Sequence, residues 1–169
     1  MPRRTTRRRA ALMLAATATA AVVAGPAPAH ALTLSPSVDG PEFQAPSSGA
    51  IVAAAVREHV GAGYAMGASG PGAFDCSGLT SAAFRAAGID LPRTSQAQFG
   101  MGRKVARDEI RKGDLVFFST AGPGASHVGV ATGRTTAISA TSSGGVMEHS
   151  TTDAYWGGAY VGARRVRGA

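Results

Sequence analysis

The sequence has no asparagine, a single cysteine and few aromatic residues, which make up 6% of the chain. The one cysteine, Cys76, has no second cysteine to pair with, and the scattered histidines lack the spacing of metal ligands. Glycines cluster before Tyr64, but without the strand, the helix and the lysine of a phosphate-binding loop. We therefore expect no metal and no cofactor, so any chemistry must come from the chain's own side chains.

The first 31 residues have the composition of an export signal. Five arginines within residues 3–9 precede the apolar run 10–24, and Ala29-His30-Ala31 fits a small-x-small cleavage site. The run is shorter than the roughly 20 residues of a membrane-spanning helix. We predict a signal peptide over residues 1–31 and a secreted, extracellular or cell-wall-associated protein with no stable membrane insertion after cleavage. The general secretory and twin-arginine routes both remain open.

The high net charge of the chain, +7, depends on that signal. Without its five arginines, 12 basic residues face 10 acidic ones, a balance of +2. So small a charge is typical of an ordinary soluble surface, with weak attraction to an anionic cell wall as the alternative, and nucleic-acid binding is not predicted.

The rest of the chain has the size of one domain with one core. Residues 32–48 are rich in proline, serine and glycine without a period, which predicts a linker or flexible arm. Residues 49–169 form the predicted folded domain, and no repeat or second domain is visible. We expect a monomer.

Cys76 lies at the predicted start of a helix. Apolar residues recur from Leu79 to Ala87 at the spacing of one helix face, Gly88 supplies a stop, and Asp75 is a suitable N-cap. The positive end of the helix dipole favours the thiolate, which is the nucleophilic form. The alternative is a small buried hydrophobic residue, but the neighbours Asp75 and Ser77 are polar and the core face is filled without Cys76.

Other segments complete an α+β pattern, with helices first and an antiparallel sheet afterwards. A helix is expected at 49–60, capped by Ser47 or Ser48, and a short helix at 94–99, capped by Thr94 or by a Ser95-x-x-Gln98 box. Residues 61–72 form a glycine-rich loop around Tyr64. The predicted strands are 115–118, 127–131, 136–140, 146–150 and 160–167.

A catalytic cysteine needs a base, and His127 is the best candidate. In its strand, His127 shares a face with Gly129 and Ala131, which should leave room for a substrate, while the intervening valines bury the other face. His59 is expected to be a solvated helix-end cation and His149 a surface residue on an edge strand.

Five segments together resemble the NlpC/P60 family of cell-wall cysteine peptidases. They are GAGYAMG around Tyr64, FDCSGLTSAAFRAAGIDLPRTS at 74–95, KGDLVFF at 112–118, HVGVATG at 127–133 and YVGARRV at 160–166. The resemblance covers roughly residues 50–167 in the family's order. It implies a papain-like core, in which the helix with the nucleophile packs on an antiparallel sheet, and it makes residues 49–169 the catalytic domain.

The expected mechanism uses Cys76 and His127 as a thiolate–imidazolium pair, with the backbone amides of Cys76 and Ser77 as the oxyanion site. The resemblance places a polar residue one strand after the base, and here Ser139 occupies that position. A serine hydroxyl is short and neutral for the task of orienting an imidazole. A different strand register would bring Glu148 or His149 there instead.

The resemblance also implies a substrate, the peptidoglycan stem peptide, cut between γ-linked D-glutamate and the diamino acid. In the family, the positions of Tyr64, Asp75, Ser77 and Ser95 fall near the subsite for the acyl side, and Arg93 is suited to meet a carboxylate. Each has a structural alternative: capping for Asp75 and Ser95, a buried hydroxyl for Tyr64 and a salt bridge for Arg93.

Two other functions remain open. One is an N-acetylmuramoyl-L-alanine amidase of related fold, which cuts between the sugar lactyl group and L-alanine. The other is a weakly active or non-catalytic cell-wall-binding protein, which the serine at position 139 motivates.

Overall fold

The structure is a computed structural model that describes residues 45–169. The predicted signal peptide, residues 1–31, and most of the predicted linker, residues 32–48, lie outside the described residues. The elements are α1 (Ser48–Arg57), β1 (Gly63–Tyr64), β2 (Ala73–Phe74), α2 (Cys76–Arg85), α3 (Ser95–Phe99), β3 (Arg103–Val105), η1 (Arg107–Glu109), β4 (Leu115–Phe118), β5 (His127–Ala131), β6 (Thr136–Thr141), β7 (Gly145–Ser150), α4 (Ala154–Gly158) and β8 (Tyr160–Arg165).

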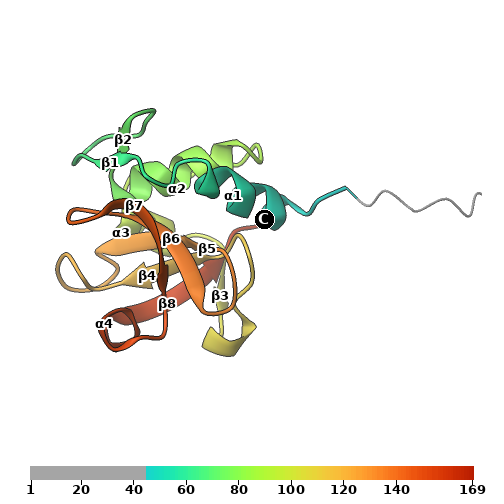
Figure 1. The fold of residues 1–169 in the computed structure, drawn as a ribbon. Coiled ribbons are helices and arrows are strands. Elements are labelled where there is room, and N and C mark those ends of the chain that lie inside the picture. The colour runs from blue at the N-terminus through green and yellow to red at the C-terminus, as the bar shows by residue number, and fades with distance from the viewer. Residues whose placement is uncertain (1–44) are drawn as a thin grey trace, which may run out of the picture. The chain divides into compact units, whose positions relative to one another are not determined.

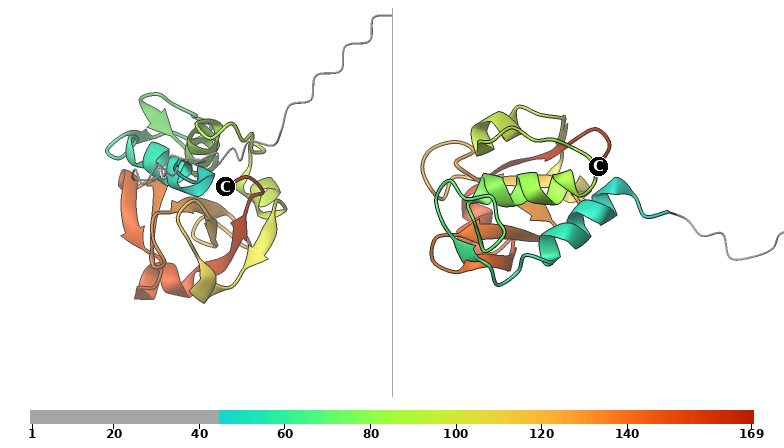
Figure 2. Two further views of the ribbon diagram at one scale, coloured as in Figure 1. Left: turned by 90° about the vertical axis from the view of Figure 1, so that its right-hand side faces the viewer. Right: turned by 90° about the horizontal axis from the view of Figure 1, so that it is seen from above.

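Six strands form one sheet in the order β3-β8-β4-β5-β6-β7, and every neighbouring pair is antiparallel. Helices α1 and α2 lie side by side over one face of this sheet (Figures 1 and 2). β1 and β2 form a separate short parallel pair. The predicted α+β class is therefore confirmed, with the helix that begins at Cys76 packed on an antiparallel sheet.

The three helices that the sequence predicted, α1, α2 and α3, each begin after a capping residue that the sequence offered. Ser47 accepts a hydrogen bond from the amide of Ala50 at the start of α1, and Asp75 accepts one from Gly78 at the start of α2. For α3 the cap is Thr94, which accepts from the amide of Ala97. Each cap satisfies an amide that the first helical turn leaves without a partner.

The sheet separates two apolar clusters because side chains alternate along each strand. Leu115 and Phe117 of β4 pack with the helices, whereas Val116 and Phe118 of the same strand face the other cluster. The helix-side cluster includes Val52, Val56, Leu79, Phe84, Val128 and Val130. The second cluster includes Ala131 and Ala163, with Trp156 and Tyr160 packed against it.

Several short elements were not predicted: the β1/β2 pair, β3, η1 and α4. They have two to five residues each, too few for a hydrophobic period to show. α4 matters most for the site, because it carries Trp156. Within residues 45–169, no helix has both the length and the apolar character that a membrane crossing demands.

Candidate active site

Cys76 and His127 meet at one cavity. Cys76 is the first residue of α2 and His127 the first of β5, and α2 packs across β5. Both residues line a cavity of about 460 Å³ that also includes Tyr64, Asp75 and Ser77 in its wall. The backbone of Val128, the residue after His127, is close enough to Cys76 to lower the pKa of its thiol, against the larger effect of burial. The fold thus brings together two residues that are far apart in the sequence.

The predicted preference of Cys76 for the thiolate is corrected by its surroundings. Burial raises the pKa of the Cys76 thiol, and the carboxylate of Asp75 raises it further. The backbone amides of Val128, Ser77 and Cys76 act in the opposite direction without reversing the shift. The helix N-terminus moderates the cost of a buried anion, but in this pocket desolvation outweighs it.

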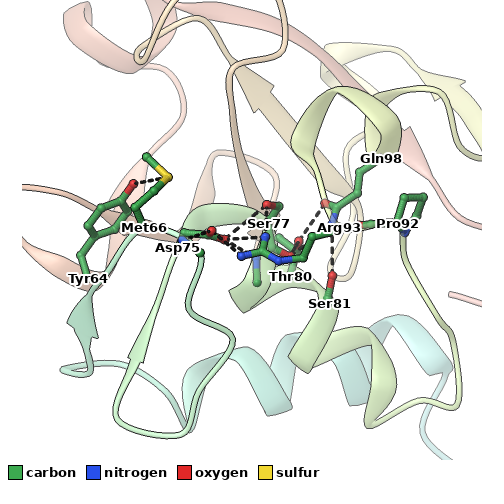
Figure 3. Close-up of polar contacts among 11 residues, drawn as sticks. Tyr64, Met66, Asp75, Ser77, Thr80, Ser81, Pro92, Arg93 and Gln98 are labelled. Atoms are coloured by element: carbon green, nitrogen blue, oxygen red, sulfur yellow. Dashed lines mark hydrogen bonds and ion pairs between the residues drawn. The ribbon is translucent and has the colours of Figure 1, made fainter.

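Asp75 is at the centre of a hydrogen-bond network beside the nucleophile (Figure 3). One carboxylate oxygen accepts from the amide of Gly78 at 2.7 Å and the other from the amide of Gly67 at 2.8 Å. Arg93 donates to the same carboxylate, at 3.0 Å to Oδ1, and to the hydroxyl of Ser77 at 2.9 Å. Although burial opposes the change, these contacts from Arg93, Gly78 and Gly67 hold the pKa of Asp75 below its usual value.

This network gives Asp75 and Arg93 the structural roles that were considered as alternatives, the cap and the salt bridge. Both still line the cavity, and the guanidinium side chain is 46% exposed. Their predicted substrate-binding role therefore stays a prediction. The carboxylate of Asp75 already accepts hydrogen bonds from four residues, Gly67, Ser77, Gly78 and Arg93.

Gln98 was considered only as a capping residue, and its role is larger. It is fully buried and its amide nitrogen donates to the carbonyls of Ser77 and Pro92 and to the hydroxyl of Ser81. Its amide oxygen accepts from Thr80 at 2.8 Å (Figure 3). Through these hydrogen bonds Gln98 connects α3 and the segment Leu91-Pro92-Arg93 to the first turns of α2. A glutamine on a short polar helix gives no local signal of this, because its partners come from another element.

The remaining predicted substrate contacts also line the cavity. The hydroxyl of Tyr64 lies 3.9 Å from the sulfur of Met66, and burial, with Cys76 and Asp75 nearby, raises the pKa of the phenol. Ser95 is buried and donates to the side chain of Gln96 at 3.2 Å. Both residues thus lie at the cavity wall, and their predicted contacts with the substrate stay a prediction.

His127 belongs to the opposite face of the sheet from α2. It pairs with Phe118 across the strands, and its ring lies 6.3 Å from that of Phe118 and 5.4 Å from that of Trp156. Burial lowers the pKa of His127 to about 4, with a smaller contribution from the nearby His149. Its Nε2 is buried and has no hydrogen-bond partner among the described residues.

Beside Gly129 the face of His127 is occupied by the neighbouring strand, whereas His127 itself lines the cavity, so the expected room for a substrate stays a prediction. Gly129 is buried, and a Cβ there would lie 3.1 Å from Cβ of Ser139 and 2.9 Å from the carbonyl oxygen of Ile138. The small residue permits the neighbouring strand to approach closely, so the space is filled by β6. The open side of His127 is its contact with the cavity.

Ser139 is fully buried, and its Oγ lies 2.8 Å from Nε2 of His149. The structure therefore brings Ser139 to His149 and gives it no hydrogen bond to His127. The predicted surface role of His149 is also wrong: β7 is an edge strand, but the residue is only 8% exposed and its ring stacks on Trp156 at 3.7 Å. Glu148 points elsewhere and contacts Thr132 and Arg57.

A second cavity, of about 270 Å³, adjoins the first at Tyr64, Ala121 and His127. Its wall adds Met147, Tyr155 and Trp156 and several hydroxyl side chains, whereas Cys76 lines only the first cavity. His127 thus stands between two spaces. Among residues 45–169, no cluster of three or more histidine, cysteine or acidic side chains is placed to hold a metal ion.

Comparison with known proteins gives a consistent set of matches. The NlpC/P60 family model matches residues 61–165. A probable endopeptidase of Corynebacterium glutamicum is 42% identical over 128 residues, which are 75% of this chain and 59% of that protein. The Escherichia coli murein DD-endopeptidase MepS/murein LD-carboxypeptidase is 40% identical over 107 residues, 63% of this chain and 56% of that one.

Solved structures agree with these sequence matches. The peptidoglycan hydrolase RipB of Mycobacterium tuberculosis is similar with a TM-score of 0.60 and 30% identity, over 70% of this chain and 64% of that chain. NlpC1 of Trichomonas vaginalis gives a TM-score of 0.67 at 26% identity, over 73% of this chain and 46% of that chain. The match spans about three fifths of the C. glutamicum protein, so the similarity covers only part of that relative.

Proposed function

Because this chain belongs to the NlpC/P60 family, we propose that it is a cysteine endopeptidase that hydrolyses peptidoglycan stem peptides. The observation that carries the proposal is the shared cavity of about 460 Å³, which has Cys76 at a helix N-terminus and His127 at a strand start in one wall. Covalent acyl transfer needs a nucleophile and a base that both reach the same cavity, and Cys76 and His127 meet this condition.

In the proposed mechanism the resting pair is a neutral thiol and a neutral imidazole. Burial raises the pKa of Cys76 and lowers that of His127 to about 4, so near pH 7 neither group carries a charge. His127 accepts the thiol proton as the sulfur attacks the amide carbonyl, and then gives that proton to the leaving amine as the carbon–nitrogen bond breaks. Water, deprotonated by His127, hydrolyses the thioester and restores the thiol.

The backbone amides of Cys76 and Ser77 are the proposed donors to the oxyanion. They belong to the first turn of α2, where amides have no carbonyl partner inside the helix and the dipole is positive. The uncharged resting pair makes this site more important, because the negative charge first appears as the tetrahedral intermediate forms.

The two cavities divide the substrate between them in this proposal. The acyl half lies in the larger cavity, beside Tyr64, Asp75, Ser77 and Ser95, and the leaving amine lies on the side of the smaller cavity, across His127. The bond we propose is that between D-glutamate, through its γ-carboxyl group, and the diamino acid. The name of the E. coli relative attributes other bonds to that protein, so the bond requires direct measurement.

We further propose that residues 1–31 are removed on export and that the protein acts outside the cell as a monomer. The arginine-rich start, the apolar run and Ala29-His30-Ala31 support the cleavage. Mass spectrometry of the protein in the culture medium should find a chain beginning at Leu32, with the mass of one chain by light scattering. An uncleaved, cell-bound chain would contradict this part.

The deciding experiment is digestion of purified sacculi with the wild-type protein and with Cys76→Ala, followed by mass spectrometry of the soluble products. We expect the wild type to release fragments cut after D-glutamate, and the variant to release none while keeping its circular dichroism spectrum. Intact stem peptides freed from glycan would identify an amidase instead. Binding to sacculi without any cleavage by the wild type would identify a wall-binding protein.

A further inference from the structure

The buried nitrogen of His127 is the starting point. Nε2 has no access to solvent and no partner in the described part of the chain, so the nitrogen that exchanges protons with the cavity is Nδ1. For Nδ1 of a neutral imidazole to accept a proton, Nε2 must carry the hydrogen. The site therefore needs an acceptor near Nε2.

The hydrogen bonds around Ser139 determine where its own hydrogen lies. Nδ1 of His149 is 2.9 Å from the carbonyl oxygen of Ser150, and a carbonyl only accepts, so Nδ1 carries the hydrogen. Burial lowers the pKa of His149, against the opposing effects of the Ser150 carbonyl, Asp153 and Glu148, so the ring is neutral and its Nε2 is an acceptor. The hydroxyl of Ser139, 2.8 Å away, must then donate to His149.

A hydroxyl that donates to His149 keeps its lone pairs for another donor. Ser139 and His127 lie on the same face of the sheet, because Ser139 stands beside Gly129 and Gly129 alternates in phase with His127. The close approach that Gly129 permits brings β6 toward β5 at this point. Trp156 covers the group, stacked on His149 and 5.4 Å from the ring of His127.

We infer that His149 is a positioning residue for the proposed peptidase, acting through Ser139: it fixes the Ser139 hydroxyl as an acceptor for Nε2–H of His127. This inference rests on the proposed function. Ser139 of β6 and His149 of β7 then orient the imidazole together. A longer side chain at position 139 could do this alone. In this structure Nε2 of His127 has no hydrogen-bond partner in the described part of the chain. The inference therefore requires the contact from Nε2 to Oγ of Ser139 to form in the substrate complex, where catalytic hydrogen bonds commonly tighten.

The chain offers a matched pair of variants at position 149. His149→Phe keeps a ring to stack on Trp156 but removes the acceptor for Ser139. His149→Gln keeps an acceptor and removes the ring. If His149 has only a structural role, His149→Phe should behave like the wild type, because it keeps the ring. If His149 positions Ser139, His149→Gln should behave like the wild type, because it keeps the acceptor.

Nitrogen-15 NMR of the imidazoles at pH 7 is the first measurement, because it needs no substrate. In the wild type we expect His127 with hydrogen on Nε2 and His149 with hydrogen on Nδ1. His149→Gln should keep the His127 tautomer, whereas His149→Phe and Ser139→Ala should give a mixture. A wild-type His127 with its hydrogen on Nδ1, or an unchanged tautomer in His149→Phe, overturns the inference.

Kinetics with muropeptides are the second measurement. We expect kcat to fall about tenfold to a hundredfold in His149→Phe and in Ser139→Ala, with KM little changed, and His149→Gln to retain most of the rate. The double variant Ser139→Ala/His149→Phe should be no slower than either single one, since both break the same chain of contacts. Multiplied effects in the double variant overturn the inference. Expected tautomers in a wild type without turnover would instead remove the proposed function and leave the positioning intact.

Discussion

The surroundings of Cys76 and those of His127 are built in different ways. Around Cys76, the side chain of Arg93 donates to Asp75 and Ser77, and the side chain of Gln98 donates to the backbone carbonyl of Ser77. Around His127, rings from β4, β7 and α4 pack together, and Nε2 has no partner in the described chain. Hydrogen bonds surround the nucleophile, whereas aromatic rings surround the imidazole of His127, and the Ser139–His149 hydrogen bond lies beside them.

The difference separates two ways of controlling a catalytic group. Directional hydrogen bonds fix the position of the first turn of α2, and with it the direction of its amides. Aromatic packing on the base side excludes water and so sets a proton affinity, because desolvation disfavours the imidazolium. We therefore expect substitutions near Cys76 to disturb geometry, and those near His127 to disturb protonation.

The largest effect should follow Gly78→Ala, on the nucleophile side. A Cβ at Gly78 would lie 2.2 Å from the carbonyl oxygen of Ala68 and 3.0 Å from Oδ1 of Asp75, so backbone must move. We expect a loss of about 3 kcal/mol or more in the free energy of unfolding, well above the roughly 1 kcal/mol that alanine gains over glycine in a helix. Urea denaturation measures it.

The control is Gly158→Ala at the end of α4, where nothing lies within 4 Å of the added Cβ. That variant should be as stable as the wild type or slightly more stable. Equal stabilities for the two alanine variants would show that the first turn of α2 tolerates displacement, and the picture of a rigid nucleophile side would be wrong.

Acid should affect the base side next. The pKa of His127 is about 4 in the folded chain and near 6.5 when unfolded, so between these values the unfolded state binds more protons. Its contribution to stability is complete above pH 6.5 and is lost as the pH falls toward 4, about 3 kcal/mol in all. The stability of His127→Gln, measured by urea unfolding at several pH values, should decline less over this window.

His149 is also buried with a lowered pKa, so His127→Gln is expected to retain part of the decline. Identical pH profiles for the wild type and His127→Gln would refute the link between burial and proton affinity.

The nucleophile side was the more predictable half from sequence. The Asp75 cap, the start of α2 at Cys76 and the Thr94 cap are local signals, because each donor and acceptor lies within a few residues. His127 was predicted as the base from the small residues on its strand face and from its motif. The neighbours of His127 were not predicted. His149 was expected at the surface, and α4, which carries Trp156, was absent from the prediction. Their packing beside His127 depends on the order of strands in the sheet, which the sequence does not show locally.

The same reason explains the error about the Cys76 thiolate. A helix N-terminus can be read from sequence, and its electrostatic effect is real, but the burial of the sulfur under β5 is a tertiary property. Ser139 lies on β6, the strand that follows that of His127, but its hydrogen-bond partner is His149, which was expected at the surface.

An intermediate effect is expected at Gln98. Gln98→Leu has a similar volume but leaves the hydroxyl of Thr80 and the carbonyls of Ser77 and Pro92 without that partner in the interior. We expect a loss of about 2 kcal/mol in the free energy of unfolding. Gln96→Leu, on the exposed side of the same short helix, should cost less than about 0.5 kcal/mol. Similar losses in the two variants would contradict the role of Gln98 as a connector.

The smallest effect should come from Gly129→Ala, the base-side counterpart of Gly78→Ala. Its Cβ would lie 3.1 Å from Cβ of Ser139 and 2.9 Å from the carbonyl oxygen of Ile138. These distances are shorter than ordinary contacts, but the overlap is smaller than the 2.2 Å contact at Gly78. β6 can shift slightly, and alanine suits a strand better than glycine, so we expect a loss of about 1–2 kcal/mol. Because the shift moves Ser139 away from β5, we expect kcat to fall by a larger factor than the small loss of folded protein would explain. If Gly129→Ala unfolds as easily as Gly78→Ala, the base side is as rigid as the nucleophile side, and burial alone does not distinguish them.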